Sequence, residues 1–214
     1  MTVRIACAQL DLAVGEVTAN RATALTAIEH AAAGGAELVV LPELTNSGYA
    51  FTDLETARRC AEGLDGPTVR QWRTASRRLG IVLVGGFCEA GDEALPRNSA
   101  VIIEDGEVLT VYRKAHLWDA EPRYFTPGDV APEVVPTSLG RLATMICYDL
   151  EFPEYARLPA LAGAQLLAAP TNWPTEPAPA DATPIEIVRV QANAAVNRMC
   201  VAACDRVGAE NGVE

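Results

Sequence analysis

The sequence predicts a single α/β domain whose strands are buried on both faces. Short continuous apolar runs, such as residues 37–41 and 165–169, alternate along the chain with longer stretches rich in helix-forming residues. This alternation is typical of a mainly parallel sheet covered by helices. The 214 residues, 50% apolar and 21% charged, match the composition of an ordinary globular core. We therefore expect residues 1–214 to belong to one domain.

The N-terminal part of the chain predicts three strands and two helices. Residues 3–10 alternate loosely and predict a strand, and residues 20–33 predict a helix that closes at a pair of glycines. The apolar run 37–41 is stopped by proline, as expected for a buried strand. A helix over 67–79 then ends at glycine, and a further buried strand covers 81–87.

A β-hairpin is predicted in the middle of the chain. Residues 98–104 and 107–113 are both rich in β-branched and apolar residues, and they are separated by Asp105 and Gly106. An Asp-Gly pair adopts the positive φ angles that a tight two-residue turn requires. Lys114 lies directly after the second of these strands.

The next segments predict a loop, two strands and a helix. Residues 121–136 contain four prolines and predict a surface loop. The apolar run 142–146 predicts a strand that leads to Cys147, and a helix is expected around 154–162. A buried strand over 165–169 is followed by a loop rich in proline and alanine that extends to Thr183.

The C-terminal part predicts a helix over 184–197, with proline in its first turn, and a strand over 199–204. The chain then ends in a polar, glycine-containing turn. Such turns ordinarily lead into another paired strand. We therefore expect the domain to lack its C-terminal strands and tail in this sequence.

Charge and hydropathy restrict the expected partners and location. With 28 acidic and 17 basic residues the net charge is −11, which disfavours binding to nucleic acid. No apolar stretch approaches the roughly 20 residues that span a bilayer, and the N-terminus lacks the pattern of a secretory signal. We expect a cytoplasmic protein that binds neither nucleic acid nor membrane.

The cysteines predict free thiols rather than disulfides or a metal site. A chain of this size and apolarity does not need disulfide bonds to fold. Cys200 and Cys204 are four residues apart and lack a second pair of ligands, so we expect no metal. The glycine pairs 34–35 and 85–86 predict turns or close packing, because neither matches a dinucleotide-binding motif.

Three reactive side chains, Glu43, Lys114 and Cys147, each follow the end of an apolar strand. Loops beyond the carboxyl ends of strands form the active sites of α/β folds, so these residues are candidates to converge. A carboxylate that accepts the thiol proton and an ammonium that stabilises negative charge would make the cysteine a nucleophile. Taken singly, each has a structural interpretation: a core cysteine, a solvated lysine and a capping carboxylate. His116 remains an alternative base.

The motifs PELTNSGY, YRKAHLW and ICYDLEFPE contain these three residues, and in this order they resemble the nitrilase superfamily of carbon-nitrogen hydrolases. The segments IACAQLDLAVGEVTAN, APTNWP and QANAAVNR extend the resemblance to essentially the whole chain. The resemblance implies a four-layer α-β-β-α sandwich, a catalytic triad of Glu43, Lys114 and Cys147, and a homodimer or larger homo-oligomer. It implies no metal or organic cofactor.

The resemblance also implies a second catalytic glutamate shortly after the lysine. Glu121 is the residue that we assign to it, with Glu133 and Glu151 as nearby alternatives. Tyr49, Tyr148 and Trp173 flank the strand ends and are the predicted substrate-binding residues. Members of this superfamily usually continue into further strands and a tail beyond the point where this sequence ends.

The residues that follow the cysteine indicate a branch of the superfamily. Cys147-Tyr148-Asp149 resembles amidases and carbamoylases, whereas nitrilases carry Cys-Trp-Glu. The predicted function is hydrolysis of a small carboxamide to the acid and ammonia through a cysteine thioester. In this prediction Glu43 is the base, Lys114 and the backbone N–H of Tyr148 stabilise the oxyanion, and Glu121 assists. The alternatives are an N-carbamoyl-amine hydrolase, a nitrilase and a non-catalytic binding domain of the same fold.

Overall fold

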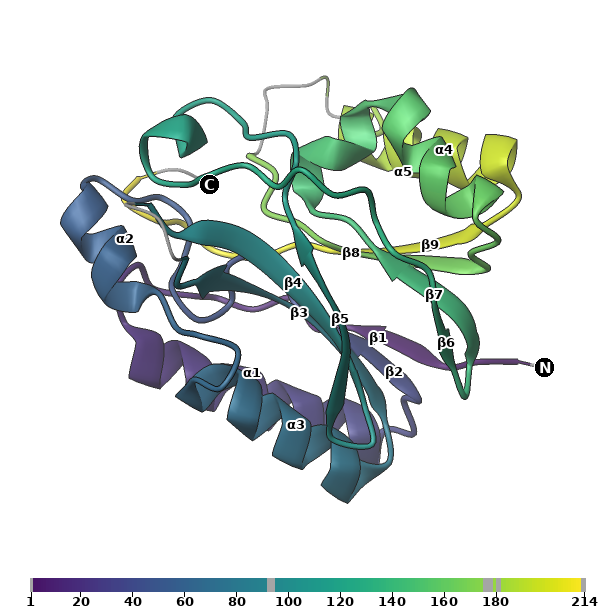
Figure 1. Ribbon diagram of the computed structural model, residues 1–214, viewed down its shortest axis with the longest axis horizontal. Helices are drawn as coiled ribbons and strands as arrows, with labels where there is room; N and C mark the ends of the chain where they lie inside the picture. Colours follow the sequence, from purple (N-terminus) through teal and green to yellow (C-terminus); the bar gives the residue numbers. More distant parts are fainter. Residues whose placement is uncertain (1, 92–94, 175–178, 180–181, 213–214) are drawn as a thin grey trace.

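Two β-sheets pack face to face in the computed structural model, and helices cover the outer side of each (Figure 1). The structure describes residues 2–91, 95–174, 179 and 182–212. Figure 1 shows α1 and α3 beneath the first sheet and α4 and α5 above the second. The predicted α/β class and the four-layer α-β-β-α arrangement are confirmed.

The first sheet has the strand order β1-β2-β3-β4-β5. Its strands are β1 (Ile5–Cys7), β2 (Leu38–Val40), β3 (Val82–Glu89), β4 (Arg97–Glu104) and β5 (Glu107–Arg113). The first three are parallel, and β4 and β5 form the predicted antiparallel hairpin. Asp105 and Gly106 have φ angles of 47° and 76°, so the turn uses the positive φ values expected of Asp-Gly.

The second sheet has the order β6-β7-β8-β9. Its strands are β6 (Val135–Thr137), β7 (Gly140–Thr144), β8 (Leu166–Pro170) and β9 (Cys200–Cys204). The strands β7, β8 and β9 are parallel, and β6 is an antiparallel edge strand. The carboxyl ends of β7 and β8 therefore lie at one edge of the sheet, where Cys147 and Asn172 follow them in the chain.

The helices are α1 (Val17–Ala33), α2 (Leu54–Cys60), α3 (Pro67–Leu79), α4 (Pro153–Leu161) and α5 (Ile185–Asn197), with short 3-10 helices η1 (Glu121–Arg123) and η2 (Cys147–Glu151). The helix α3 has the predicted bounds because proline suits its first turn and Gly80, at φ 66°, ends it in the left-handed conformation. Within the described part of the chain, no helix is both long and apolar enough to cross a membrane.

Several predictions from sequence were wrong in detail. The segment 121–136 is not only a loop, since η1 begins it and β6 ends it, where Val135 pairs with Leu142. The helix α2 was missed, although the Asp53 side chain accepts a hydrogen bond from the Thr56 N–H at its start. Cys200 is exposed rather than buried. Much of the loop rich in proline and alanine lies outside the described residues.

The core between the sheets consists of small and branched apolar side chains that alternate along the strands. Val40, Val84 and Ile102 of the first sheet belong to one buried cluster with Leu142 and Ala168 of the second. On the outer side of the first sheet, Trp72 of α3 packs so closely on β3 that a Cβ at Gly85 would lie 2.7 Å from its ring. The predicted close packing at glycines 85–86 is therefore present.

Candidate active site

Cys147 follows β7 and is the first residue of η2. Its φ angle is 46°, in the left-handed region that non-glycine residues rarely occupy. The side chain is only 4% exposed, and Sγ lies 3.8 Å from the carbonyl oxygen of Asn172, which follows β8. Backbone strain of this kind persists where the surrounding structure holds a residue in a particular orientation, and it is common at functional sites.

Asp149 holds the turn that carries Cys147. Its buried carboxylate accepts hydrogen bonds from the Ile146 N–H at 3.2 Å and from the Tyr112 hydroxyl of β5 at 2.7 Å. It also accepts one from the His116 N–H at 2.9 Å, and the Nδ1 atom of His116 lies 2.8 Å from the same carboxylate. The His116 ring stacks on Phe152 with centroids 4.0 Å apart. His116 is thus linked to the cysteine turn through Asp149, and it lines neither of the two cavities described below.

Lys114 lies between two carboxylates in the interior. Its Nζ donates to Glu43 Oε1 at 2.8 Å and to Glu121 Oε2 at 2.7 Å. The side chains of Lys114 and Glu43 are fully buried, and that of Glu121 is 4% exposed. The chain segments after β2 and β5 therefore bring together two of the three predicted triad residues, with Glu121 as the second carboxylate.

Asn98 completes this cluster and was not predicted. Its Nδ2 donates to Glu43 Oε1 and to Glu121 Oε1, at 2.7 Å in each case, so it bridges the same two carboxylates as Lys114. The side chain lies near the start of β4 and is buried. Its only sequence signal is a polar residue at the start of an apolar strand, which is too common to identify a site.

The two carboxylates share one ammonium, so their charges are not balanced. Desolvation by burial raises the pKa of Glu43 to about 7, although the attraction of Lys114 lowers it, and the nearby charge of Glu121 adds to the rise. Burial opposes the charge of Lys114, but Glu43 and Glu121 raise its pKa well above the ordinary value. Glu43 Oε2 has no hydrogen-bond partner among the described residues. Glu43 can therefore exchange a proton near neutral pH beside a permanent cation.

The thiol of Cys147 belongs to the same electrostatic environment. Burial raises its pKa well above the ordinary value, the charge of Glu43 raises it further, and the charge of Lys114 lowers it. The resting cysteine is accordingly a neutral thiol near a carboxylate and an ammonium. A group of this kind needs a base before it can act as a nucleophile.

Close backbone packing places Glu43 at the junction of the two sheets. Its N–H donates to the carbonyl oxygen of Thr171, after β8, at 3.2 Å. Leu44, the next residue, has a φ angle of 48°. A Cβ at Gly86 would lie 2.7 Å from the Glu43 Cα, so glycine is needed for β3 to pass this turn.

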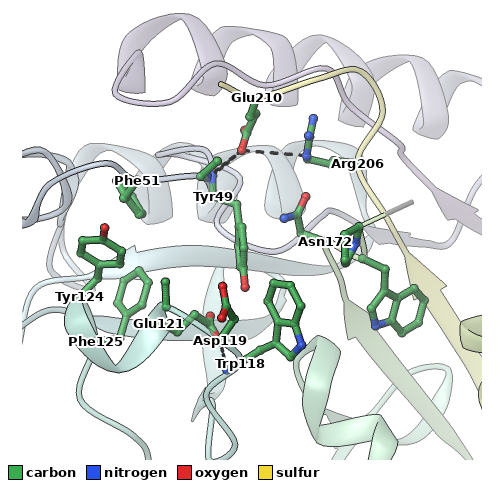
Figure 2. A pocket seen from close by; sticks show the side chains of 14 residues that line it. Tyr49, Phe51, Trp118, Asp119, Glu121, Tyr124, Phe125, Asn172, Arg206 and Glu210 are labelled. Carbon is green, nitrogen blue, oxygen red and sulfur yellow. Dashed lines mark hydrogen bonds and ion pairs between the residues drawn. The ribbon is translucent and has the colours of Figure 1, made fainter. Parts of the chain in front are cut away.

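Two adjacent cavities open beside this cluster. The larger, of about 220 Å³, is lined by aromatic residues, with Tyr49 and Trp118 beside Glu121 (Figure 2). The smaller, of about 170 Å³, contains Cys147 together with Tyr148. Trp118, Asn172, Trp173 and Pro174 line both cavities. The larger cavity does not include the cysteine, so we take the smaller one as the site of chemistry and the larger as its extension.

Tyr49, Tyr148 and Trp173, which the sequence predicts to bind substrate, each line at least one of the two cavities. Tyr49 and Trp173 line the larger cavity, and Tyr148 lines the smaller one beside Cys147. Of the three candidate glutamates, Glu121 contacts Lys114, whereas Glu133 accepts a hydrogen bond from Thr110 and Glu151 pairs with Arg189. Among the residues that the structure describes, no group of three or more His, Cys, Asp or Glu side chains is placed to hold a metal ion.

Comparisons with known proteins agree with this geometry. The carbon-nitrogen hydrolase family matches residues 4–214. The chain is 35% identical to a nitrilase from Pyrococcus abyssi, over 99% of this chain and 78% of the relative. It is 33% identical to an N-carbamoylputrescine amidase from Solanum tuberosum, over 91% and 68% of the two chains.

Solved amidase structures share the fold. The NitN amidase from Nesterenkonia sp. AN1 superposes with a TM-score of 0.83 at 29% identity, over 99% of this chain and 81% of the amidase. A glutamate-to-glutamine mutant of that amidase carries acrylamide added to its active-site cysteine. This structure superposes with a TM-score of 0.82 at 28% identity, over 99% of this chain and 82% of the amidase.

Proposed function

The chain belongs to the carbon-nitrogen hydrolase family, and on this basis we propose that it hydrolyses a small carboxamide through a thioester on Cys147. The observation that supports this most strongly is the shared ammonium of Lys114, beside a Glu43 carboxyl whose pKa is about 7 and a strained, buried cysteine. Together these groups supply a base, a cation and a nucleophile at the junction of the two sheets.

In the proposed first half of the reaction, Glu43 accepts the thiol proton and the Cys147 sulfur attacks the amide carbonyl carbon. The raised pKa of the thiol makes this base necessary, and the pKa of Glu43 near neutrality makes the transfer feasible. Lys114 and the Tyr148 backbone N–H stabilise the oxyanion. The C–N bond then breaks, and the leaving nitrogen takes the proton from Glu43 and departs as ammonia.

In the second half, Glu43 deprotonates a water molecule that attacks the thioester carbonyl. The C–S bond breaks, the acid leaves, and the proton returns from Glu43 to Cys147. Glu121 stays beside Lys114, with its Oε2 accepting from the Lys114 ammonium and from the Trp118 N–H at 2.6 Å. In this proposal Glu121 keeps the lysine charged and in place while Glu43 changes its protonation state.

An amide is favoured over a nitrile by the structural neighbours. A glutamate-to-glutamine mutant of the Nesterenkonia amidase carries the acetamide moiety of fluoroacetamide covalently at its active-site cysteine. The glutamate and the cysteine replaced in its double mutant are separated along the chain by as many residues as Glu43 and Cys147. N-carbamoyl amines are the second candidate, because N-carbamoylputrescine amidases are relatives over nine-tenths of the chain.

The test is ammonia release from a panel of small amides, N-carbamoyl amines and nitriles. We expect turnover of an amide, and a loss on the order of 10⁴-fold or more in Cys147→Ala. Cys88→Ala is the matched control, because Cys88 is equally buried but lies in β3 away from both cavities. Release of carbon dioxide with ammonia would identify a carbamoyl substrate instead, and activity confined to nitriles would identify a nitrilase.

Intact-mass analysis after treatment with acrylamide or iodoacetamide gives an independent readout. Cys7 and Cys200 are exposed and can also be alkylated, so we expect Cys147→Ala to carry one adduct fewer than the wild type and Cys88→Ala to carry the same number. An unreactive Cys147, together with no turnover on any compound of the panel, would refute the catalytic proposal and support a binding domain of the same fold.

We also propose that the protein forms a homodimer or larger homo-oligomer. Support comes from exposed apolar side chains on the adjacent helices α4 and α5, namely Leu158, Leu161, Ile185, Ile187, Val188 and Val196. A face of this kind is typical of an interface between subunits. Light scattering should give a mass of at least two chains, and Leu161→Arg with Val196→Arg should shift the mass to one chain.

A further inference from the structure

The segment that follows β9 reaches the wall of the larger cavity. Val207 forms a parallel bridge with Asp11, which lies after β1, and its N–H donates to the Leu10 carbonyl oxygen at 2.9 Å. This contact directs the chain toward the turn at residues 48–50, far away in sequence. Figure 2 shows Arg206 and Glu210 of this segment beside Tyr49.

Glu210 binds this turn through its carboxylate. Its Oε2 accepts hydrogen bonds from the backbone N–H groups of Tyr49 and Ala50, both at 2.9 Å. The Nε atom of Arg206 lies 4.0 Å from the same oxygen, and the Glu210 side chain is 1% exposed. A buried carboxylate with two backbone donors and a cation forms strong, directional hydrogen bonds.

Two neighbours make this contact specific to the turn. The Asn211 side chain donates to the Ala50 carbonyl oxygen at 2.7 Å, so the N–H and the carbonyl group of Ala50 are both hydrogen-bonded to this segment. At Gly48, with φ 72°, a Cβ would lie 2.8 Å from Glu210 Oε1 and 2.7 Å from the Val14 Cα. Glycine at this position therefore allows the carboxylate to approach the backbone.

The side chain that this turn orients faces the reactive groups. Tyr49 points into the cavity (Figure 2), and its ring centroid lies 5.9 Å from Lys114 Nζ. Burial raises the pKa of the Tyr49 hydroxyl, and the negative charge of Glu121 raises it further, so the hydroxyl stays a hydrogen-bond donor. Tyr49 is thus placed to touch a substrate beside Lys114.

We propose that Glu210 is a positioning residue, which acts through Tyr49 to orient the wall of the substrate pocket. This inference rests on the proposed amidase function. It assigns a role in substrate binding to Glu210, which lies 63 positions after Cys147 on a segment that contains no residue of the triad. Loss of the carboxylate frees two backbone N–H groups and lets the Tyr49 ring leave its orientation over Lys114.

A double-mutant cycle on Tyr49 and Glu210 tests this role. We expect Glu210→Ala to raise KM for the best amide about tenfold and to change kcat less than about threefold. Tyr49→Ala should raise KM similarly, and the double variant should be no worse than Tyr49→Ala alone. Glu210→Gln should stay within about threefold of wild type, because one amide oxygen can accept both N–H groups as Oε2 does.

Glu62→Ala is the matched control. Glu62 also accepts from a backbone N–H, that of Thr68 at 2.7 Å, and also pairs with an arginine, Arg21 at 3.5 Å, but it lies outside both cavities. We expect this variant to lower the melting temperature without changing KM. If Glu210→Ala does not fold, Glu210→Asp, whose shorter side chain cannot reach both donors, takes its place in the cycle.

Additive effects on KM in the double variant, or an unchanged KM with a lowered melting temperature in Glu210→Ala, would overturn the inference. A wild-type protein without turnover would instead overturn the proposed function. In that case KM is replaced, in the same double-mutant cycle, by the acrylamide concentration that gives half-maximal alkylation of Cys147. A positioning role predicts that this concentration rises in Glu210→Ala and not in Glu62→Ala.

Discussion

Two clusters of carboxylates and cations form on opposite sides of the β4–β5 hairpin, from residues that are adjacent in sequence, and only the Lys114 cluster is fully buried. Arg113 and Ser99 contact Glu89, whereas their neighbours Lys114 and Asn98 contact Glu43 and Glu121. Adjacent residues of a strand point to opposite faces, so one hairpin serves both clusters.

In the Glu89 cluster, one carboxylate accepts hydrogen bonds from Arg113 and Ser99. Arg113 donates to both oxygens of Glu89, at 2.7 and 2.8 Å, and the Ser99 hydroxyl donates at 2.6 Å. The guanidinium binds the carboxylate in bidentate geometry, which is a strong form of such a pair. We expect this pair to contribute to stability rather than to chemistry.

The Lys114 cluster is not balanced, since one ammonium serves two carboxylates and Glu43 Oε2 has no partner among the described residues. Burial raises the pKa of Glu43 to about 7, and the charge of Glu121 adds to this rise against the attraction of Lys114. The difference teaches that full burial of a carboxylate and its cation, with a second carboxylate on the same ammonium, separates a group able to transfer protons near neutral pH from an ion pair whose guanidinium is 43% exposed. Each prediction below compares matched residues of the two clusters.

Replacement of the two glutamates should give the largest contrast. We expect Glu43→Gln to lower kcat/KM about 10³-fold through loss of the base, and Glu89→Gln to change it less than about threefold.

The two substitutions should have opposite effects on the free energy of unfolding. Glu43→Gln removes a carboxylate whose ionisation is disfavoured in the folded state, so it should raise the free energy of unfolding at pH 8 by up to about 3 kcal/mol. Glu89→Gln should lower it by about 2 kcal/mol.

These effects are measured by ammonia release and by urea unfolding monitored at pH 8. An active Glu43→Gln enzyme would refute the role of Glu43 as base. Equal destabilisation by the two substitutions would show that charge balance does not distinguish the clusters.

Replacement of the two cations should give the next contrast. Lys114→Met leaves two buried carboxylates without an ammonium, and we expect kcat/KM to fall about 10²- to 10³-fold as oxyanion stabilisation is lost. Arg113→Met should affect stability only, because Arg113 lies outside both cavities. Lowering the pH from 8 to 5 should restore part of the stability of Lys114→Met, since the carboxyl groups then become neutral. Denaturation midpoints at the two pH values provide the measurement.

The pH dependence of activity tests the pKa of Glu43 directly. The raised pKa of about 7 means that Glu43 takes up a proton as the pH falls through neutrality, and the protonated form cannot act as a base. We expect kcat/KM to fall about tenfold per pH unit below pH 7 and to be level just above it. Glu89→Gln should show the same profile. A profile that stays level down to pH 5 would assign the base function elsewhere.

Replacement of Asn98 and Ser99, the uncharged donors of the two clusters, should give the smallest difference in activity. Asn98→Ala removes a donor to both Glu43 and Glu121, so we expect the pKa of Glu43 to rise and kcat/KM at pH 7 to fall about tenfold. The acid limb of the pH profile should move to higher pH. Ser99→Ala should leave both the profile and kcat/KM within about threefold of wild type, and a similar shift in this variant would contradict the comparison.

Much of the fold could be predicted from the sequence because its signals are local. Continuous apolar runs identified the buried strands, glycine and proline marked the ends of α3, and Asp105-Gly106 identified the hairpin turn. The strand β6 was missed because three residues among prolines carry no pattern. Glu43, Lys114 and Cys147 were candidates because each follows a strand, and strand ends are readable in the sequence.

Only the tertiary structure decided how these residues interact. Glu121 rather than Glu133 or Glu151 contacts Lys114, and Asn98 bridges the two carboxylates. Glu210 reaches the turn of Tyr49 from the opposite end of the chain. A polar side chain carries no local mark of its burial or partner, because both depend on which distant segments the sheets bring together. The sequence thus determined the reactive groups and the elements that carry them, while packing between the two sheets decided which carboxylates share the lysine and which of them can exchange a proton.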